Sequence, residues 1–310
     1  MSKQLIVVIG ATGTQGGSVV AALLKHAAYA VRGVTRSPDA PAAKALQEKG
    51  VDVVSATLGD KASLIKAFEG AYAVFGVTVP FTQDSEEVQG RNIVDAVRAA
   101  KVPLLVWSSL PSATEVSKGK YTTIYPFDQK NAVDKYIPTV GQPAVILHTG
   151  WFADNLLHQL NPDLNNSKKW NIMFSLRRET KMPSVWVGAD LGNIVTAIID
   201  HWEDESWKQR LTKEPIAVAP YEISGGEQAH ILASVAGKEI DYVQLTDVQS
   251  PYAEQTDVHR QALKDLGNFM DEGLFKYPDH SVLLQKLGVK THSFEDYVRE
   301  VVVPHLQSME

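Results

Sequence analysis

The strongest structural signal in this 310-residue chain lies near its N-terminus, in Leu5-Ile6-Val7-Val8-Ile9 followed by Gly10-Ala11-Thr12-Gly13-Thr14-Gln15-Gly16-Gly17. A continuous apolar run that ends in glycine is typical of a parallel strand buried on both faces. The G-x-x-G-x-x-G spacing predicts a tight turn at Gly10, a close approach of backbone to phosphate at Gly13, and close packing of helix on sheet at Gly16. The following helix would offer free N–H groups to a dinucleotide.

Apolar runs alternate with helical patterns through the first half of the chain. Five further strands are expected at residues 31–35, 51–54, 73–77, 104–107 and 144–148, with amphipathic helices between them such as Glu86–Ala100. Strands separated by helices of this size imply right-handed crossovers and a Rossmann-type, doubly wound parallel sheet. We therefore predict an α/β domain over residues 1–152, with part of 185–205 added to it.

After Gly150 this rhythm changes. Polar turns, a helix cap at Ser224–Glu227 and a helical pattern over Ala253–Met270 indicate mixed secondary structure. We expect residues 153–310 to form a smaller α/β lobe that covers the carboxyl ends of the strands and binds a substrate or a partner.

Composition excludes several classes of protein. The chain is 44% apolar and 21% charged, with a net charge of −6 and no cysteine. This apolar fraction is too high for a disordered chain, and no apolar run approaches the roughly 20 residues that cross a membrane. Without cysteine there are no thiolate zinc sites, and no histidine–carboxylate pair has metal-ligand spacing. The acidic balance argues against direct nucleic-acid binding.

The residue that follows the second strand bears on the choice of cofactor. An NAD site usually carries an acidic residue about 20 residues beyond the glycines. This sequence has Arg36 in that region. A guanidinium suits a 2′-phosphate through charge and paired hydrogen bonds, which favours NADP(H); the alternative is a solvated surface arginine.

Further motifs carry a family resemblance. The glycine-rich stretch and Arg36, together with Phe75-Gly76-Val77-Thr78, Val88-Gln89-Gly90-Arg91 and Phe127-Asp128-Gln129-Lys130, resemble the NmrA-like family of atypical short-chain dehydrogenase/reductases, in particular its redox sensors. The resemblance covers nearly the whole chain. It implies NADP(H) binding and often a regulatory role without turnover, in the cytoplasm or also the nucleus, as a monomer or homodimer. Some relatives are instead NADPH-dependent reductases of quinones or small carbonyl compounds.

The resemblance also implies a set of cofactor-binding residues. The phosphate loop would comprise Gly10, Thr12, Gly13, Thr14, Gln15 and Gly16, and Arg36 would bind the 2′-phosphate. Thr57 and Leu58 fall where relatives carry a Gly-Asp-x segment beside the adenine, although the aspartate is absent here. Val77, Thr78 and Val79 would pass near the ribose, and Arg91 would face the cofactor. Lys130, Trp151, Phe152 and Asn155 would lie at the nicotinamide end.

Three residues are candidates for catalysis. Typical short-chain reductases place a tyrosine acid four residues before the lysine, on the same helix face. Lys130 instead has Pro126 at that position. We expect Pro126 in the first helical turn and Tyr125 just outside the helix, where Tyr125 (or Tyr121) either turns inward as an acid or packs at the surface. Ser108 either binds a substrate carbonyl or satisfies its own turn. His148, within an apolar strand, is expected to be buried with its own partner.

Two functions remain open. The first, which the missing tyrosine favours, is an NADP(H)-binding redox-sensing regulator with weak or no turnover that contacts a regulatory protein partner. The second is an NADPH-dependent oxidoreductase acting on a quinone, enone, carbonyl or imine of a small-molecule substrate, with a proton from Lys130, Tyr125 or water. We expect neither a metal nor a membrane to take part.

Overall fold

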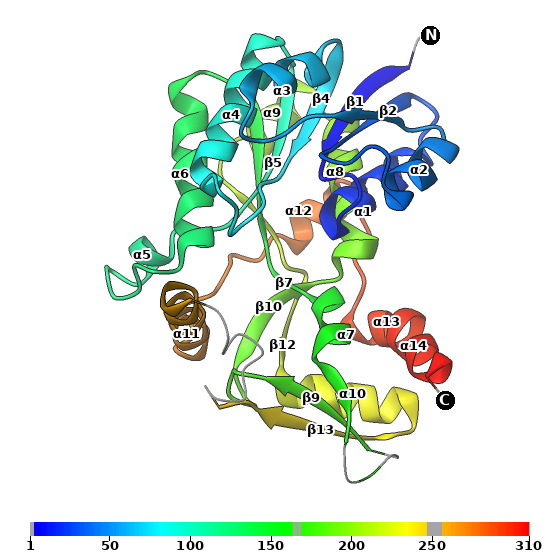
Figure 1. Ribbon diagram of the computed structural model, residues 1–310, viewed down its shortest axis with the longest axis vertical. Helices are drawn as coiled ribbons and strands as arrows, with labels where there is room; N and C mark the ends of the chain where they lie inside the picture. The colour runs from blue at the N-terminus through cyan, green and yellow to red at the C-terminus, as the bar shows by residue number, and fades with distance from the viewer. Residues whose placement is uncertain (1–2, 164–165, 167–168, 247–255, 310) are drawn as a thin grey trace.

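The computed structural model describes residues 3–163, 166, 169–246 and 256–309. Its centre is a seven-stranded parallel sheet with the order β11-β6-β5-β4-β1-β2-β3 (Figure 1). The strands are β1 (Gln4–Ile9), β2 (Tyr29–Thr35), β3 (Asp52–Ser55), β4 (Ala71–Gly76), β5 (Leu104–Ser109), β6 (Ala144–Thr149) and β11 (Ile216–Val218). This arrangement confirms the predicted doubly wound α/β class.

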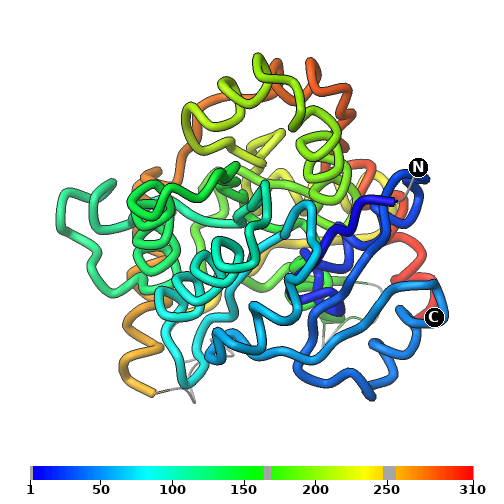
Figure 2. The backbone as a smooth tube through the Cα atoms, turned by 90° about the horizontal axis from the view of Figure 1, so that it is seen from above, coloured from blue at the N-terminus to red at the C-terminus, as the bar shows by residue number. Residues whose placement is uncertain are grey.

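Helices cover both faces of this sheet. The larger ones are α1 (Thr14–Leu23), α2 (Pro41–Glu48), α3 (Lys61–Phe68), α4 (Glu86–Ala99), α6 (Tyr125–Thr139) and α8 (Val187–Asp200). On one face α1 packs against α8, and on the other α4 packs between α3 and α6. In Figure 2 the segments of α8, α9 (Glu205–Leu211) and α12 (Ser281–Lys286) lie together, away from α3 and α4.

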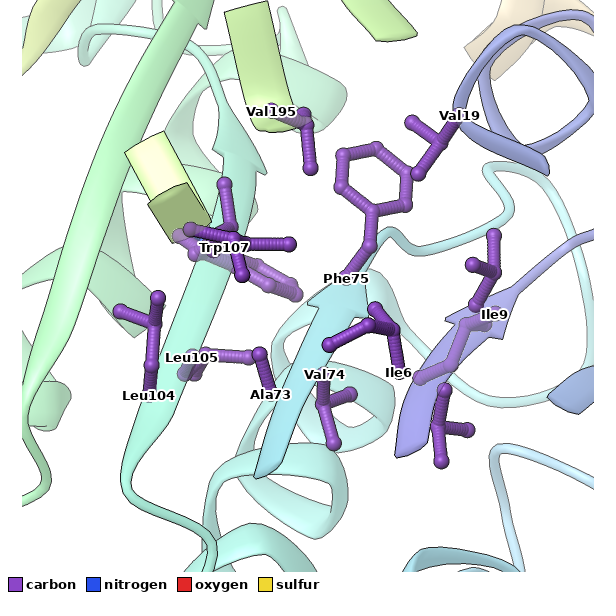
Figure 3. Close-up of a cluster of buried hydrophobic side chains, with 14 of the residues drawn as sticks. Ile6, Ile9, Val19, Ala73, Val74, Phe75, Leu104, Leu105, Trp107 and Val195 are labelled. Carbon is purple, nitrogen blue, oxygen red and sulfur yellow. The ribbon is translucent and has the colours of Figure 1, made fainter. Parts of the chain in front are cut away.

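The main core lies between the sheet and these helices. Every residue of β5 is buried, as expected for a central strand covered on both faces. Figure 3 shows Phe75 of β4 pointing toward Val19 of α1 and Val195 of α8. The core and sheet also take in segments from the second half of the chain, because β11 pairs with β6 and Leu284 of α12 joins the same cluster.

In Figure 1 a smaller lobe lies below the carboxyl ends of the strands. It contains two three-stranded sheets, β12-β10-β7 and β13-β9-β8. Their strands are β7 (Trp151–Phe152), β8 (Leu160–Pro162), β9 (Lys169–Phe174), β10 (Lys181–Val185), β12 (Tyr221–Ser224) and β13 (Glu239–Gln244). The remaining short helices are α5 (Ala113–Val116), η1 (Ala153–Asn155), α7 (Leu156–Gln159), α13 (Phe294–Tyr297), the π-helix η2 (Val298–Val302) and α14 (Val303–Ser308).

Two longer helices of this lobe were expected from the sequence. The cap predicted at Ser224–Glu227 is confirmed: Ser224 and Glu227 form a reciprocal capping box at the start of α10 (Gly225–Ala236). The helix predicted over Ala253–Met270 corresponds to α11 (Asp257–Asp271), and residues 253–255 lie outside the described residues. Thr256 caps α11 by accepting a hydrogen bond from the His259 N–H.

Candidate functional site

The glycine-rich turn connects β1 to α1 at the carboxyl edge of the sheet. Gly10 has a φ of +65°, in the left-handed region that favours glycine. A Cβ on Gly16 would lie 2.2 Å from the Gly10 carbonyl oxygen, so only glycine lets α1 begin this close to the turn. The Gly13 N–H donates to the Gly10 carbonyl over 2.8 Å. The predicted backbone roles of Gly10 and Gly16 are therefore confirmed.

The N-terminus of α1 has the properties of an anion site. Its N-cap is Gly13, no described side chain caps it, and its first turn holds no acidic residue. By contrast, Asp60 caps α3 and Ser85 caps α4. Thr12, Gly13 and Thr14 are exposed. The first N–H groups of α1 therefore remain open to a phosphate.

Arg36 lies beside this turn and is exposed. It follows β2 directly, and β2 pairs with β1 so that Val34 lies opposite Ile9. Among the described residues, no carboxylate lies within ion-pair distance of Arg36. Arg32 of the same strand differs, because Asp52 and two backbone carbonyls already hold its guanidinium. Of the two arginines, Arg32 within β2 and Arg36 just after it, Arg36 is therefore the one whose guanidinium is available to a ligand.

Lys130 is buried near the end of β4 and forms an ion pair with Glu86. Their side chains are 9% and 2% exposed. Glu86 Oε2 also accepts a hydrogen bond of 2.5 Å from the Thr78 hydroxyl. The two helices that carry the pair come close at Gly90, where a Cβ would lie 2.4 Å from the Val133 side chain. The fold therefore encloses a charged pair beside the strand end that the sequence placed near the cofactor.

Glu86 was missed by the sequence analysis, which named it only as the first residue of the amphipathic helix expected over Glu86–Ala100. One signal was available. Glu86 lies in phase with the buried Gly90, Ile93 and Val97 along α4, whereas its neighbour Glu87 lies in phase with the exposed Arg91.

The environment of Lys130 acts on its charge in two directions. Burial lowers the pKa of Lys130, while the carboxylates of Glu86 and Asp134 oppose that shift. Asp134 in turn accepts a 2.9 Å hydrogen bond from the Trp107 indole and lies 2.9 Å from His148 Nε2. The predicted partner of His148 is therefore present, although the structure leaves His148 half-buried where full burial was expected.

The loop after β4 is held in place by Gln89. Its side-chain amide bonds both the N–H and the carbonyl of Val79 over 2.9 Å, and also reaches Thr82 and Asp84. Val77 and Thr78 are buried, whereas Val79 is exposed. At the tip of the loop, Phe81 lies against His259 of α11, with ring centroids 4.7 Å apart.

The predicted catalytic partners of Lys130 are either exposed or bound to other residues. Tyr125 is 38% exposed and begins α6 itself, which corrects the prediction that it lies just outside the helix; Pro126 does fall in the first turn. Tyr121 donates to Glu272 over 2.6 Å. Ser108 donates to the Gln15 side chain over 2.6 Å, which corrects the alternative in which it bonds within its own turn.

Three other predicted residues have structural partners. Arg91 is bound to Glu87 over 2.8 Å and its guanidinium lies 4.4 Å from the ring centre of Tyr136, so its charge is used between α4 and α6. The Thr57 N–H bonds Ser63, and the Leu58 carbonyl accepts from Asn92 of α4. These contacts fix the turn after β3 and leave the Thr57 side chain exposed.

Trp151 borders a cavity of about 820 Å³, as far as the described residues delimit it. Its apolar wall includes Trp151, Phe174, Leu176, Leu266 and Met270. Helix α11, which supplies part of this wall, also packs Phe269 against Phe127, one turn before Lys130. Phe152 and Asn155 are half-buried in β7 and η1 next to Trp151. Helix α11 therefore supplies part of the cavity wall and also packs against α6, the helix that carries Lys130.

In the part of the chain that the structure describes, no group of three or more histidine and carboxylate side chains is arranged to hold a metal ion. No helix there has both the length and the apolar character needed to cross a membrane.

Comparisons with known proteins agree with this architecture. The NmrA-like family model matches residues 2–298. The chain is 30% identical over 275 residues to the NmrA-like family domain-containing oxidoreductase notA of Aspergillus sp. (strain MF297-2), covering 82% of this chain and 79% of that protein. It is also 30% identical over 265 residues to the oxidoreductase lnbB of Aspergillus flavus, covering 79% and 77%.

Two solved structures share the fold at low sequence identity. NmrA, a negative transcriptional regulator crystallised with NADP, has a TM-score of 0.82 at 20% identity, covering 100% of this chain and 98% of that one. The NADPH-dependent quinone oxidoreductase QOR2 of Escherichia coli has a TM-score of 0.69 at 20% identity, covering 97% and 99%. The chain belongs to the NmrA-like family.

Proposed function

We propose that the protein binds NADP(H) along the carboxyl edge of its seven-stranded sheet and uses it to reduce a small organic substrate. The observation that carries this proposal is the buried amine of Lys130, which Glu86 holds beside the end of β4. A buried charge of this kind is costly, and such groups cluster at functional sites. The relatives named as oxidoreductases support the same reading.

The residues at this edge fit an NADP-type dinucleotide. The uncapped N-terminus of α1 would bind the pyrophosphate, because Thr12, Gly13 and Thr14 are exposed there. Arg36 would bind the 2′-phosphate, since its guanidinium is exposed and beside the turn. Lys130 would donate hydrogen bonds to the ribose next to the nicotinamide. NmrA, which shares the fold, has been crystallised with NADP.

When bound, NADPH would supply a hydride to the substrate. The contribution of the chain would be the matching proton. Lys130 Nζ is the proposed donor to the substrate oxygen or nitrogen, and it would recover a proton from water after each turnover. Burial lowers the pKa of Lys130, which makes its ammonium a better acid than an exposed lysine.

The cavity beside Trp151 suits a flat substrate that also carries polar groups. Trp151 and Phe174 lie with ring centroids 5.0 Å apart on its wall, and polar side chains such as Gln244, Gln261 and Asn268 line the rest together with leucine and methionine. Such a surface favours ring systems that bear hydrogen-bonding groups. Quinones, cyclic enones and cyclic imines match this chemistry.

A second candidate function is a non-catalytic NADP(H)-binding regulator. Pro126 occupies the position where short-chain reductases carry their tyrosine acid, and the Ser108 hydroxyl is already bound to Gln15. Two of the three usual catalytic partners are therefore missing or engaged, which favours cofactor binding without turnover.

A turnover screen separates the two functions. NADPH consumption would be followed with quinones, cyclic enones, aldehydes and cyclic imines for the wild type, Lys130→Met and Lys135→Met. Lys135 is a matched control, because it lies on the same helix and pairs with Glu115 at the surface. Turnover that Lys130→Met loses and Lys135→Met keeps supports the reductase. Tight NADPH binding without turnover on any substrate supports the regulator.

A further inference from the structure

Helix α4 begins with two adjacent glutamates in opposite environments. Glu86 is 2% exposed and pairs with Lys130, whereas Glu87 is 39% exposed and pairs with Arg91 one turn further along the same helix. Both have the same chemistry and nearly the same place in the sequence. Their different surroundings give an internal comparison between a buried and a surface carboxylate.

Glu86 joins three elements at one point. Its carboxylate binds Lys130 of α6 and accepts a hydrogen bond from the hydroxyl of Thr78, which follows β4. Its backbone N–H donates to the Gln129 side chain over 2.8 Å, so α4 is fixed to two successive residues of α6. Its second oxygen, Oε1, is buried and has no hydrogen-bond partner among the residues that the structure describes. A buried carboxylate oxygen left in this state is unfavourable, and it marks a group kept for more than packing.

We infer that Glu86 is a positioning residue, which holds the ammonium of Lys130 beside Thr78 for its contact with the cofactor; this inference rests on the proposed function. Two carboxylates act on Lys130. Glu86 contacts it directly from α4, and Asp134 lies one turn further along α6 and is shared with His148 of β6 and Trp107 of β5. Without Glu86, only Asp134 would oppose the effect of burial, so Lys130 would lose its proton at a lower pH.

The inference predicts a distinctive pH dependence of cofactor affinity. A protonated Lys130 attracts the anionic dinucleotide and donates three hydrogens, whereas the neutral amine does neither as well. In Glu86→Gln, NADPH affinity should therefore fall with rising pH earlier than in the wild type, with the midpoint displaced by about one pH unit or more. A purely structural role would instead lower affinity by the same factor at every pH.

The test compares the wild type, Glu86→Gln and Glu87→Gln by NADPH titration across the neutral and alkaline range. Glu87→Gln is expected to follow the wild type. Parallel curves for wild type and Glu86→Gln would overturn the inference. A second readout needs no cofactor: NMR of isotope-labelled lysine, with Lys130→Met identifying the resonance, follows the amine itself. Its pKa should be lower in Glu86→Gln than in the wild type; an unchanged value contradicts the inference even if NADPH does not bind.

If Glu86→Gln does not fold stably, a double variant still tests the inference. Glu86→Gln/Lys130→Met removes both charges, so it should be more stable than Glu86→Gln alone, which leaves an unpaired buried ammonium. A double variant no more stable than Glu86→Gln would show that Glu86 acts on the fold independently of Lys130, contrary to the inference.

Discussion

The ammonium of Lys130 and the carboxylate of Glu86 form an ion pair that is enclosed between α4 and α6. On the same helix, Lys135 pairs with Glu115 at the surface, where more than half of each side chain is exposed. The two pairs have the same chemistry and differ in burial. This difference separates a pair kept for the site from one that is a solvated surface contact.

The two pairs should contribute differently to stability. Removing one partner of an enclosed pair leaves an uncompensated charge, so Lys130→Met should lower the free energy of unfolding by about 3 kcal/mol. Lys135→Met should change it by less than about 1 kcal/mol, because exposed pairs contribute little. Denaturant unfolding monitored by circular dichroism measures both. Equal small losses would mean that the Lys130 pair is not enclosed in solution.

The lowered pKa of Lys130 also has a consequence for the pH dependence of stability. The pKa of Lys130 in the folded state lies below its ordinary value of 10.5. Between these two pKa values the folded state has released the Lys130 proton, whereas the unfolded state still holds it. In that window the unfolded state binds more protons, so the contribution of Lys130 to stability rises with pH up to about 10.5 and is smallest below the folded pKa. The difference in unfolding free energy between wild type and Lys130→Met should follow this rise. A difference that is constant from neutral to alkaline pH would contradict the shift.

Selectivity between the two cofactors should depend on Arg36. Arg36→Asp removes the charged hydrogen bonds to a 2′-phosphate and adds repulsion, so NADPH affinity should fall by about 10-fold to 100-fold while NADH affinity changes little. Arg32→Gln is the control on the same strand. It disturbs the contacts with Asp52 and should lower stability without altering the ratio of the two affinities. Equal losses of NADPH and NADH binding in Arg36→Asp would rule out this role.

The two glycines at the start of α1 should respond in opposite ways to alanine. In Gly16→Ala the new Cβ meets the Gly10 carbonyl at 2.2 Å, which forces the helix away from the turn. We expect a loss of about 1–3 kcal/mol in stability and weaker NADPH binding. In Gly17→Ala the nearest atom is 3.7 Å away, so the variant should gain about 0.5–1 kcal/mol from the better helix former. Thermal unfolding of both proteins decides between these outcomes.

The aromatic wall of the cavity should control substrate binding and leave cofactor binding intact. Trp151→Ala removes a large apolar surface next to Phe174, so the KM of a ring substrate should rise by about 10-fold. NADPH affinity should stay within about twofold, because neither the glycine-rich turn nor Arg36 lines this wall. Trp151→Phe keeps an aromatic face, so it should preserve most of the wild-type affinity for the substrate. A change confined to NADPH affinity would place Trp151 against the cofactor instead.

Local patterns in the sequence were sufficient for the Rossmann half of the fold. The apolar runs of β1 and β5 and the spacing of α4 each identify their element without knowledge of the partners. Strand β11 was missed because Ile216–Val218 is only three residues long and becomes a strand by pairing with β6. Residues distant in sequence explain the other differences, as in the hydrogen bond between Ser108 and Gln15 across 93 positions.

The candidate site was predicted only in part, because local signals identify some of its residues and contacts between distant residues determine the others. Glycine spacing and Arg36 are local signals, and Lys130 was found through its motif. Glu86 could not be told apart from Glu87 by residue type, because acidic residues are common in the first turn of a helix. Only its phase with Ile93 and Val97 indicates burial, and its pairing with Lys130 depends on how α4 and α6 pack.

Calorimetric titration of the wild-type protein with NADPH and with NADH tests the central claim most directly. The account predicts one site per chain, with NADPH bound at least about 10-fold more tightly than NADH, because Arg36 binds the 2′-phosphate. Absence of NADPH binding, or tighter binding of NADH, would contradict it.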